Sequence, residues 1–381
     1  MSIFIEVQAL QPLGPNNLNR DDSGSPKTVN YGGSIRARVS SQAWKRAIRE
    51  GFHNDPTVSS DNLSMRTKRV VLTIVDRILA KDDTIDKETA IKAACKVLEK
   101  TKLKIKDTNN RGDLTYEFDA LYFIGANALA KFTDMVVEAI KSGDAAAWAK
   151  DNEKLILKTA KEDHEVDVSL FGRMAANNVD LNVEATCQVA HAISVEEAAP
   201  EADYFTAVDD LAVAVDNDKG QLTASGAGYL DVNEFTTPTF FRYAVVNATN
   251  LADKNHLDDK TKAAKVTAAF LRSFALTLPT GKQNAYASNS LPSLLYVSIK
   301  DTTPNNLVTA FQTPVNAPIL KNATDRLVKA EEDYRDTFNL KPLNSWVVRV
   351  GEDTAEADQL GEHVTFEEML NAVETELEAK L

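Results

Sequence analysis

Apolar residues recur with two different periods along this chain, and the order of the two periods limits the folds that it can adopt. Helical spacing in 41–50 and 260–278 predicts two amphipathic helices. Strand-like patterns alternate with these helices and cover 2–10, 166–174, 184–195, 239–247 and 293–300. A mixed order of this kind predicts an α+β fold.

When the longer insertions are set aside, the order is strand, helix, strand, strand, helix, strand. This is the ferredoxin-like, or RRM-like, arrangement, whose open sheet often binds single-stranded RNA. Helical periodicity in 65–81, 85–100, 118–141 and 145–160 predicts a large helical insertion. Residues 11–33 are rich in Pro, Asn, Asp, Ser and Gly, which predicts a long loop.

Charge is distributed unevenly along the chain. The formal net charge is −13, but ten acidic residues and one lysine lie within 352–380. Apolar residues at helical spacing from Phe366 to Leu377 predict an amphipathic C-terminal helix with a solvated acidic face. Residues 23–49 hold no acidic residue and six basic ones: Lys27, Arg36, Arg38, Lys45, Arg46 and Arg49. Such a stripe can bind RNA despite the negative net charge, and a solvated charged face is an equally good interpretation.

The predicted helix that follows Ser40 is a candidate phosphate site. The first backbone N–H groups of a helix have no intrahelical partner, and Ser40 and Gln42 add polar groups at this end. Lys45 and Arg49 share one face of the helix, with Arg46 beside them. We therefore expect the helix start and its basic side to bind a phosphate together. The alternative is an ordinary capped surface helix.

A second candidate lies at the end of the predicted strand 166–174. Gly172 permits close backbone approach, and Arg173 can pair with phosphate. Met174 is a flexible apolar residue of the kind that can act as a wedge between stacked bases. A methionine at the end of a strand is, however, more often a filler of the core.

Two further segments are weaker candidates. Tyr204 and Phe205 are adjacent aromatics within a polar, acidic stretch, which predicts either a hairpin tip that packs on RNA or a neighbouring subunit, or a short buried strand. After the helix at 260–278, Lys282 and Gln283 follow a glycine and can reach phosphate or base edges.

The usual motifs of catalysis and metal binding are missing from the sequence. The five histidines form no HExxH or HxH pattern, and Cys95 and Cys187 form no CxxC pair. There is no P-loop, dinucleotide fingerprint or GxSxG elbow. No apolar run approaches the roughly 20 residues that span a bilayer, and residues 1–6 lack the features of a secretory signal. We expect a cytoplasmic, non-catalytic protein without cofactor, metal or membrane partner.

Short sequence words spread over residues 1–290 resemble the CasC family, the backbone subunit of the type I-E CRISPR surveillance complex called Cascade. The words stand in the order found in that family, and the series as a whole carries the resemblance. They are LNRDD at 18–22, RARVSSQ at 36–42 with KR at 45–46, GRMA at 172–175, AHAI at 190–193, FTAVDDL at 205–211, FRYA at 241–244 and GKQ at 281–283.

The resemblance implies a hand-shaped protein. The expected parts are an RRM-like palm (1–58, 185–195 and 233–350), a helical fingers insertion (59–184), a thumb hairpin (196–232) and an acidic C-terminal helix (351–381) that matches nothing in the family. Copies are expected to stack head to tail along guide RNA (crRNA). Other Cascade subunits and target DNA are the further partners, and base pairing with the guide reads the sequence. A separate nuclease-helicase is expected to cut the DNA.

The resemblance also implies which side chains hold the guide. Residues of the loop and first helix hold its backbone, Met174 lies against bases, and thumb residues fold over a flipped nucleotide. With the candidates argued above, the RNA-binding set is Arg20, Lys27, Ser40, Gln42, Lys45, Arg46, Arg49, Arg173, Met174, Phe205, Thr206, Val208, Lys282 and Gln283. The family often has Trp where this chain has Tyr204. A basic helical face of Lys154, Lys158 and Lys161 is a weaker candidate for target DNA.

Two other classes of function remain compatible with the sequence. A metal-dependent nuclease that processes RNA or DNA would use carboxylates such as Asp21, Asp22, Asp209 and Asp210. A protein-only filament scaffold would use the thumb and the basic helix for contacts between subunits. Metal-dependent cleavage would favour the first class, and a filament free of nucleic acid would favour the second.

Overall fold

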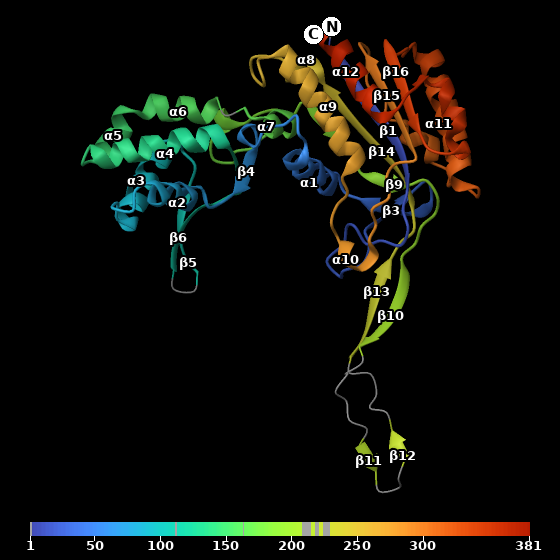
Figure 1. Ribbon diagram of the computed structural model, residues 1–381, viewed down its shortest axis with the longest axis horizontal. Coiled ribbons are helices and arrows are strands. Elements are labelled where there is room, and N and C mark those ends of the chain that lie inside the picture. Colours follow the sequence, from blue (N-terminus) through green and yellow to red (C-terminus); the bar gives the residue numbers. More distant parts are fainter. Residues whose placement is uncertain (1, 111–112, 163, 208–214, 218–220, 224–228) are drawn as a thin grey trace.

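The computed structural model describes residues 2–110, 113–162, 164–207, 215–217, 221–223 and 229–381. Within these residues, the largest sheet has nine strands in the order β17-β16-β15-β1-β14-β9-β3-β2, with β8 also paired to β14 (Figure 1). Its pairs are antiparallel, except for β16 with β17. The strands are β1 (Phe4–Pro12), β2 (Thr28–Tyr31), β3 (Ser34–Val39), β8 (Cys187–Val189), β9 (Ala192–Ser194), β14 (Thr239–Asn247), β15 (Leu294–Lys300), β16 (Asn344–Arg349) and β17 (Glu362–His363).

The predicted strands at 2–10, 239–247 and 293–300 are confirmed as β1, β14 and β15, which lie together at the centre of the sheet. The strand pattern at 184–195 is divided between β8 and β9, and both pair with β14. A mixed α+β fold is therefore confirmed.

One face of the sheet is covered by helices. They are α1 (Ser41–Gly51), α8 (Ala248–Leu251), α9 (Lys260–Leu276) and α12 (Phe366–Lys380). Ile5 and Val7 of β1 pack in one core with Trp44 of α1, Phe270 of α9 and Leu370 of α12. The predicted helices at 41–50 and 260–278 and the amphipathic C-terminal helix are confirmed, the last with a capping box at its start.

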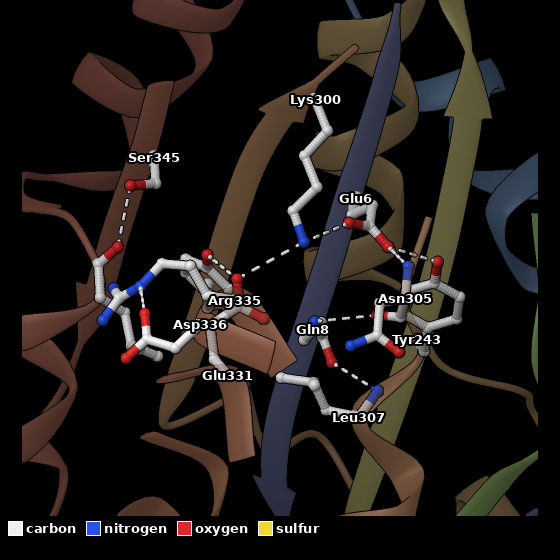
Figure 2. A network of polar contacts seen from close by, with 12 residues as sticks. Glu6, Gln8, Tyr243, Lys300, Asn305, Leu307, Glu331, Arg335, Asp336 and Ser345 are labelled. Carbon is white, nitrogen blue, oxygen red and sulfur yellow. Dashed lines mark hydrogen bonds and ion pairs between the residues drawn. The ribbon is translucent and has the colours of Figure 1, made fainter. Parts of the chain in front are cut away.

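The opposite face of the sheet is covered as well, so the expectation of an open sheet is wrong. The covering elements are η4 (Leu307–Phe311), α11 (Ile319–Phe338) and η5 (Glu352–Gln359). Tyr296 and Phe311 are buried between sheet and helices. Figure 2 shows the polar contacts in this layer, where Lys300 forms ion pairs with Glu6 of β1 (2.8 Å) and Glu331 of α11 (3.4 Å). RNA therefore has no access to this part of the sheet surface.

The helical insertion has a core of its own, which includes Val75, Leu98, Leu129 and Ile156. Its elements are η2 (Ser60–Asn62), β4 (Ser64–Thr67), α2 (Val70–Lys81), α3 (Lys87–Glu99), β5 (Ile105–Asn110), β6 (Asp113–Phe118), β7 (Tyr122–Gly125), α4 (Ala126–Lys141), α5 (Ala145–Asp151) and α6 (Glu153–Lys161). Helices are confirmed in all four predicted segments, but 65–81 begins within strand β4, and 118–141 includes the end of β6 and strand β7 before α4. Strands β4 and β7 pair with each other.

The predicted strand at 166–174 is wrong, because the chain forms helix α7 (Val166–Phe171) there. The alternation of apolar and polar residues suggested a strand with one exposed face. Residues 166–170 are instead all buried, including Asp167 and Ser169. The backbone N–H of Ser64 donates a hydrogen bond to the Asp167 carboxylate (3.0 Å), which satisfies one oxygen of this buried group. A short apolar run does not distinguish a strand from a buried helical turn.

A two-stranded ribbon extends away from the sheet (Figure 1). It pairs β10 (Glu201–Ala207) with β13 (Tyr229–Phe235), and β11 (Val215–Asn217) pairs with β12 (Gln221–Thr223) further along the chain. The remaining short helices are η1 (Phe52–Asn54), η3 (Val179–Leu181) and α10 (Gln283–Tyr286). The C-terminal segment 351–381 is more than a helix, since η5 and β17 precede α12.

Candidate nucleic-acid interface

Helix α1 presents its start and one side to solvent. Ser40 caps the helix by accepting a hydrogen bond from the N–H of Ala43 (3.3 Å), and its own N–H donates to the Asn19 side chain (2.9 Å). Trp44 and Ile48 turn toward the core, so Lys45 and Arg46 face outward. The first-turn amides that Ser40 does not cap remain available to an anion.

A groove of 1090 Å³ lies beside this helix. Its walls come from α1, from residues 277–281 after α9, and from β4 and β7 of the helical insertion. Its basic lining residues are Lys45, Arg46, Arg49 and Arg66, whereas Glu50 is the one acidic residue among the described residues that line it. The groove is therefore strongly cationic in a protein of net negative charge.

A second cavity of 550 Å³ continues this groove toward the loop at 18–24. The two share Leu18, Asn19 and Gly281 as lining residues. Arg20 lines the second cavity and is exposed. Gly281 permits the close contact between loop and turn, because a Cβ on it would lie 2.4 Å from the carbonyl oxygen of Leu18.

Asp21 organises the Arg20 loop. Its carboxylate accepts hydrogen bonds from the hydroxyl and N–H of Ser23 and from the N–H of Ser25. The Ser23 hydroxyl is the main cause of the lowered pKa of Asp21. This carboxylate, suggested by the sequence as a metal ligand, therefore holds a turn together. Asp22 is exposed, and Asp209 and Asp210 lie outside the described residues.

Most of the basic residues in the stripe 23–49 remain accessible. Within the described ranges, Lys27, Lys45 and Arg46 form no ion pair, and Arg49 pairs only with Glu50 (3.2 Å). Arg20, which lies just before the stripe, also has no ion pair in these ranges. Arg36 is the exception, so the expectation of a continuous basic stripe is wrong at this position. Its guanidinium is buried and donates to backbone carbonyls, including those of Ser194, Val195 and Phe311.

Arg173 and Met174 differ in a way that the sequence did not predict. Arg173 is buried and donates hydrogen bonds to the carbonyls of Leu181 (3.0 Å) and Ala160 (3.0 Å), so the expectation that it binds phosphate is wrong. Met174 is 78% exposed, so the interpretation as core filler is wrong for this residue. Gly172, directly before them, ends helix α7 with a positive φ of +77°, which favours glycine.

The aromatic pair of the ribbon lies within strand β10, and the expected position at a hairpin tip is wrong. Tyr204 pairs with Val232 and Phe205 with Asp231 across the β10–β13 ladder. Tyr204 is 72% exposed and Thr206 is also exposed, so the alternative of a buried strand is wrong as well. Val208 lies outside the described residues.

The turn after α9 connects the groove to the base of the ribbon. The Nζ of Lys282 donates to Asn233 Oδ1 of β13 (2.9 Å), and Gln283 donates to Asn289. Lys282 itself adopts left-handed backbone angles, with φ +52°. Both side chains, proposed from sequence as RNA ligands, thus also make contacts within the protein.

The lysines of α6 form a weaker basic face than expected. Lys158 pairs with Glu162 (3.7 Å), and Lys161 pairs with Asp180 (3.4 Å). Lys154 is exposed and has no carboxylate partner in the described part of the chain. The local potential is therefore more mixed than the spacing of three lysines suggested.

The sequence did not identify the groove residues that come from the helical insertion, Arg66, Leu121 and Phe123. Arg66 lies on β4, Phe123 on β7 and Leu121 directly before β7, and all three face α1 across the groove. Figure 1 shows β4 beside α1. A basic cluster of Arg66, Lys68 and Arg69 was the only visible signal. Its relation to α1 depends on pairing between strands more than 50 residues apart in sequence.

The described residues hold no group of three or more His, Cys, Asp or Glu side chains arranged to bind a metal ion. Burial raises the pKa of the Cys95 thiol to about 11 and that of Cys187 to about 12, so neither thiol is a ready nucleophile. In the part of the chain that the structure describes, none of the helices has the length and apolar character of a membrane span.

The fold and the groove define an α+β protein with an accessible cationic groove between its sheet and its helical insertion. The family model of CT1975-like proteins, Cas_CT1975, matches residues 5–372, and the chain belongs to this family. A comparison with curated protein sequences gave no match.

Two solved structures are similar over nearly the whole chain. A chain of a "CRISPR RNA-guided surveillance complex, pre-nicking" has a TM-score of 0.80 and 30% identity, and the match covers 97% of this chain and 100% of that one. A chain of a "CRISPR RNA-guided surveillance complex" has a TM-score of 0.69 and 25% identity, with 97% and 99% covered.

Proposed function

We propose that this chain is the guide-RNA-binding backbone subunit of a CRISPR RNA-guided surveillance complex, of the CasC type found in type I-E Cascade. The observation that carries the proposal is the cationic groove, which Lys45 and Arg46 line without carboxylate partners among the described residues. A sugar-phosphate backbone supplies the row of anions that such a groove requires. Similarity to chains of CRISPR RNA-guided surveillance complexes supports this ligand.

In this proposal the RNA backbone follows the Arg20 loop and the start of α1, and its bases remain free to pair with target DNA. The order β15-β1-β14, continued by β8 and β9, with α1 and α9 on one face, supports an RRM-like palm. Because α11 covers the second face, the guide binds beside α1 instead of across the sheet. The helical insertion acts as fingers and the β10–β13 ribbon as a thumb.

Copies stack head to tail along the guide, beside other Cascade subunits. The projecting ribbon with its exposed Tyr204 and Thr206 supports such a contact, because it offers groups beyond the sheet that can reach a neighbouring copy (Figure 1). A head-to-tail interface that does not close produces a filament. The chain itself catalyses no reaction, works in the cytoplasm, and leaves DNA cleavage to another protein.

The direct test is to purify the protein from cells that express a CRISPR array and from cells that do not. We expect the ratio of absorbance at 260 and 280 nm to rise with the array, and the extracted RNA to have the guide sequence. Protein free of RNA that still forms filaments would contradict the proposal and support a scaffold. Metal-dependent cleavage of the RNA by the purified protein would contradict the non-catalytic role.

A further inference from the structure

The ring of Phe123 lies between two parts of the molecule that are distant in sequence. The guanidinium carbon of Arg49, on α1, is 5.2 Å from the ring centroid, and that of Arg66, on β4, is 5.6 Å from it. Arg66 and Phe123 are direct partners in the β4–β7 ladder, so the strand pairing fixes one side of this arrangement. All three residues line the cationic groove.

The charges at this ring are only partly compensated. Arg66 is exposed and has no ion pair with a carboxylate in the described ranges. Arg49 pairs with Glu50, whose side chain is 56% exposed and can move into solvent. Stacking on an aromatic face restricts a guanidinium and leaves its in-plane N–H donors free. Two like charges held near one ring favour an anion that accepts several hydrogen bonds.

We propose that Arg49 and Arg66, held against Phe123, form a clamp for one phosphodiester of the RNA, which joins the helical insertion to the sheet. This inference rests on the proposed function and adds a contact from the insertion to it. A phosphodiester fits because Lys45 and Arg46 of the same groove offer further cations along α1. A continuous series of phosphates matches a row of cations better than a single carboxylate does. RNA in the clamp restricts the motion of β4 and β7 relative to α1.

Arg66 allows a clean test, because its exposed side chain has no hydrogen bond in the described residues and its loss should leave the fold intact. Arg69 is a matched control: it is also exposed on the insertion, carries the same charge and does not line the groove. The probe is a synthetic single-stranded RNA of guide sequence, bound to the full chain over a range of salt concentrations. Melting temperatures of all variants verify that they are folded.

For Arg66→Ala we expect about a fivefold loss of affinity at low salt, the upper range for an exposed ion pair, and a salt slope reduced by about 0.7. Arg66→Lys should recover part of the affinity, because it keeps the charge but loses the planar fork. Arg69→Ala should leave the slope unchanged. Addition of RNA should slow hydrogen exchange at 64–67 and 122–125 in the unmodified protein, and less so in Arg66→Ala.

Equal affinity and equal slope for Arg66→Ala and Arg69→Ala would overturn the clamp while leaving the proposed function in place. Failure of the unmodified protein to bind the RNA at all would overturn both. The two failures are therefore distinguishable in one set of titrations.

Discussion

The Nζ of Lys300 lies 2.8 Å from Oε2 of Glu6, and both side chains are fully buried. The other Glu6 oxygen accepts hydrogen bonds from the Tyr243 hydroxyl (2.6 Å) and the N–H of Asn305 (2.6 Å). Lys300 also contacts Glu331, so the ion pair joins β1 and β15 to α11 (Figure 2). These contacts fix the helical layer that closes this face of the sheet.

Removal of one partner of this ion pair should lower the free energy of unfolding far more than removal of both. Lys300→Met leaves the Glu6 carboxylate buried without its cation and should lower the free energy of unfolding by about 3–5 kcal/mol. The double variant Glu6→Gln with Lys300→Met should be more stable than Lys300→Met alone. Urea unfolding measures both. If Lys300→Met lowers the free energy of unfolding by less than about 1 kcal/mol, the ion pair does not stabilise the helical layer on the sheet.

Asp167 makes stability depend on pH. Burial raises the pKa of its carboxyl from 3.8 to about 6, while the hydrogen bonds from Ser64 and the charge of Arg49 oppose the rise. Because the pKa is higher in the folded state, this group's contribution to stability falls as pH rises from about 4 to about 6 and is constant above that. At 1.36 kcal/mol per pKa unit, the free energy of unfolding lost over this pH range is about 3 kcal/mol.

Asp167→Asn keeps an acceptor for the N–H of Ser64 and cannot ionise. It should therefore be more stable than the unmodified protein at pH 8, with the difference shrinking toward pH 4. Asp76→Asn, on the exposed surface of α2, is the control and should show little change. Urea unfolding at pH 4, 6 and 8 measures the differences. If the stability difference between Asp167→Asn and the unmodified protein is the same at pH 4, 6 and 8, the Asp167 carboxyl does not have a raised pKa in the folded protein.

Gly281→Ala should separate the Arg20 loop from the turn after α9. The new Cβ would lie 2.4 Å from the Leu18 carbonyl oxygen and 2.7 Å from that of Asn17, both on the backbone. We expect a destabilisation of about 1–3 kcal/mol and weaker RNA binding, because the Arg20 loop must move. Gly14→Ala is the control, since a Cβ there meets nothing within 4 Å. Indistinguishable thermal melts and RNA affinities for the two variants would count against this close contact.

Arg173 and Met174 are neighbours with opposite predicted effects. Arg173→Ala leaves buried carbonyls of Leu181 and Ala160 without donors, at a cost of about 1–3 kcal/mol for each. Met174→Ala should change stability by less than about 0.5 kcal/mol, because the side chain is exposed, and should reduce RNA affinity modestly. Thermal melting and RNA titration separate the two. Unfolding of Met174→Ala would restore its interpretation as a core residue.

Much of the fold could be predicted from periodicity alone. β1, β14, β15, α1, α9 and α12 have clear apolar patterns that match their packing on the sheet. Helix α7 was missed because it has only six residues, and the five from 166 to 170 are buried, polar and apolar alike, so no exposed polar face marks it as a helix. The closed second face of the sheet was missed because the covering layer depends on buried polar contacts such as Glu6 with Lys300, which look like surface residues in a sequence.

The candidate site could be predicted only in part. The cations of α1 and the Arg20 loop are close in sequence and lie in one groove and its extension. The sequence could not distinguish the buried Arg36 and Arg173 from these exposed cations. Each donates to backbone carbonyls, and a backbone carbonyl leaves no signal in a sequence, as an acidic side chain would. Arg66 and Phe123 reach the groove only through the β4–β7 pairing, which local patterns do not encode.

If cations near α1 that have no carboxylate partner among the described residues hold the RNA backbone, RNA affinity must depend on salt through their phosphate contacts. Alanine at Arg20, Lys45 and Arg46 should reduce the slope of log K against log salt by about 0.7 for each lost phosphate contact, about 2 in all. The control replaces Lys254, Lys260 and Lys265, which are exposed and lie outside the groove. We predict a reduced slope for the first variant and an unchanged slope for the control. An equal slope for the first variant and the unmodified protein would show that these three cations do not hold the RNA backbone.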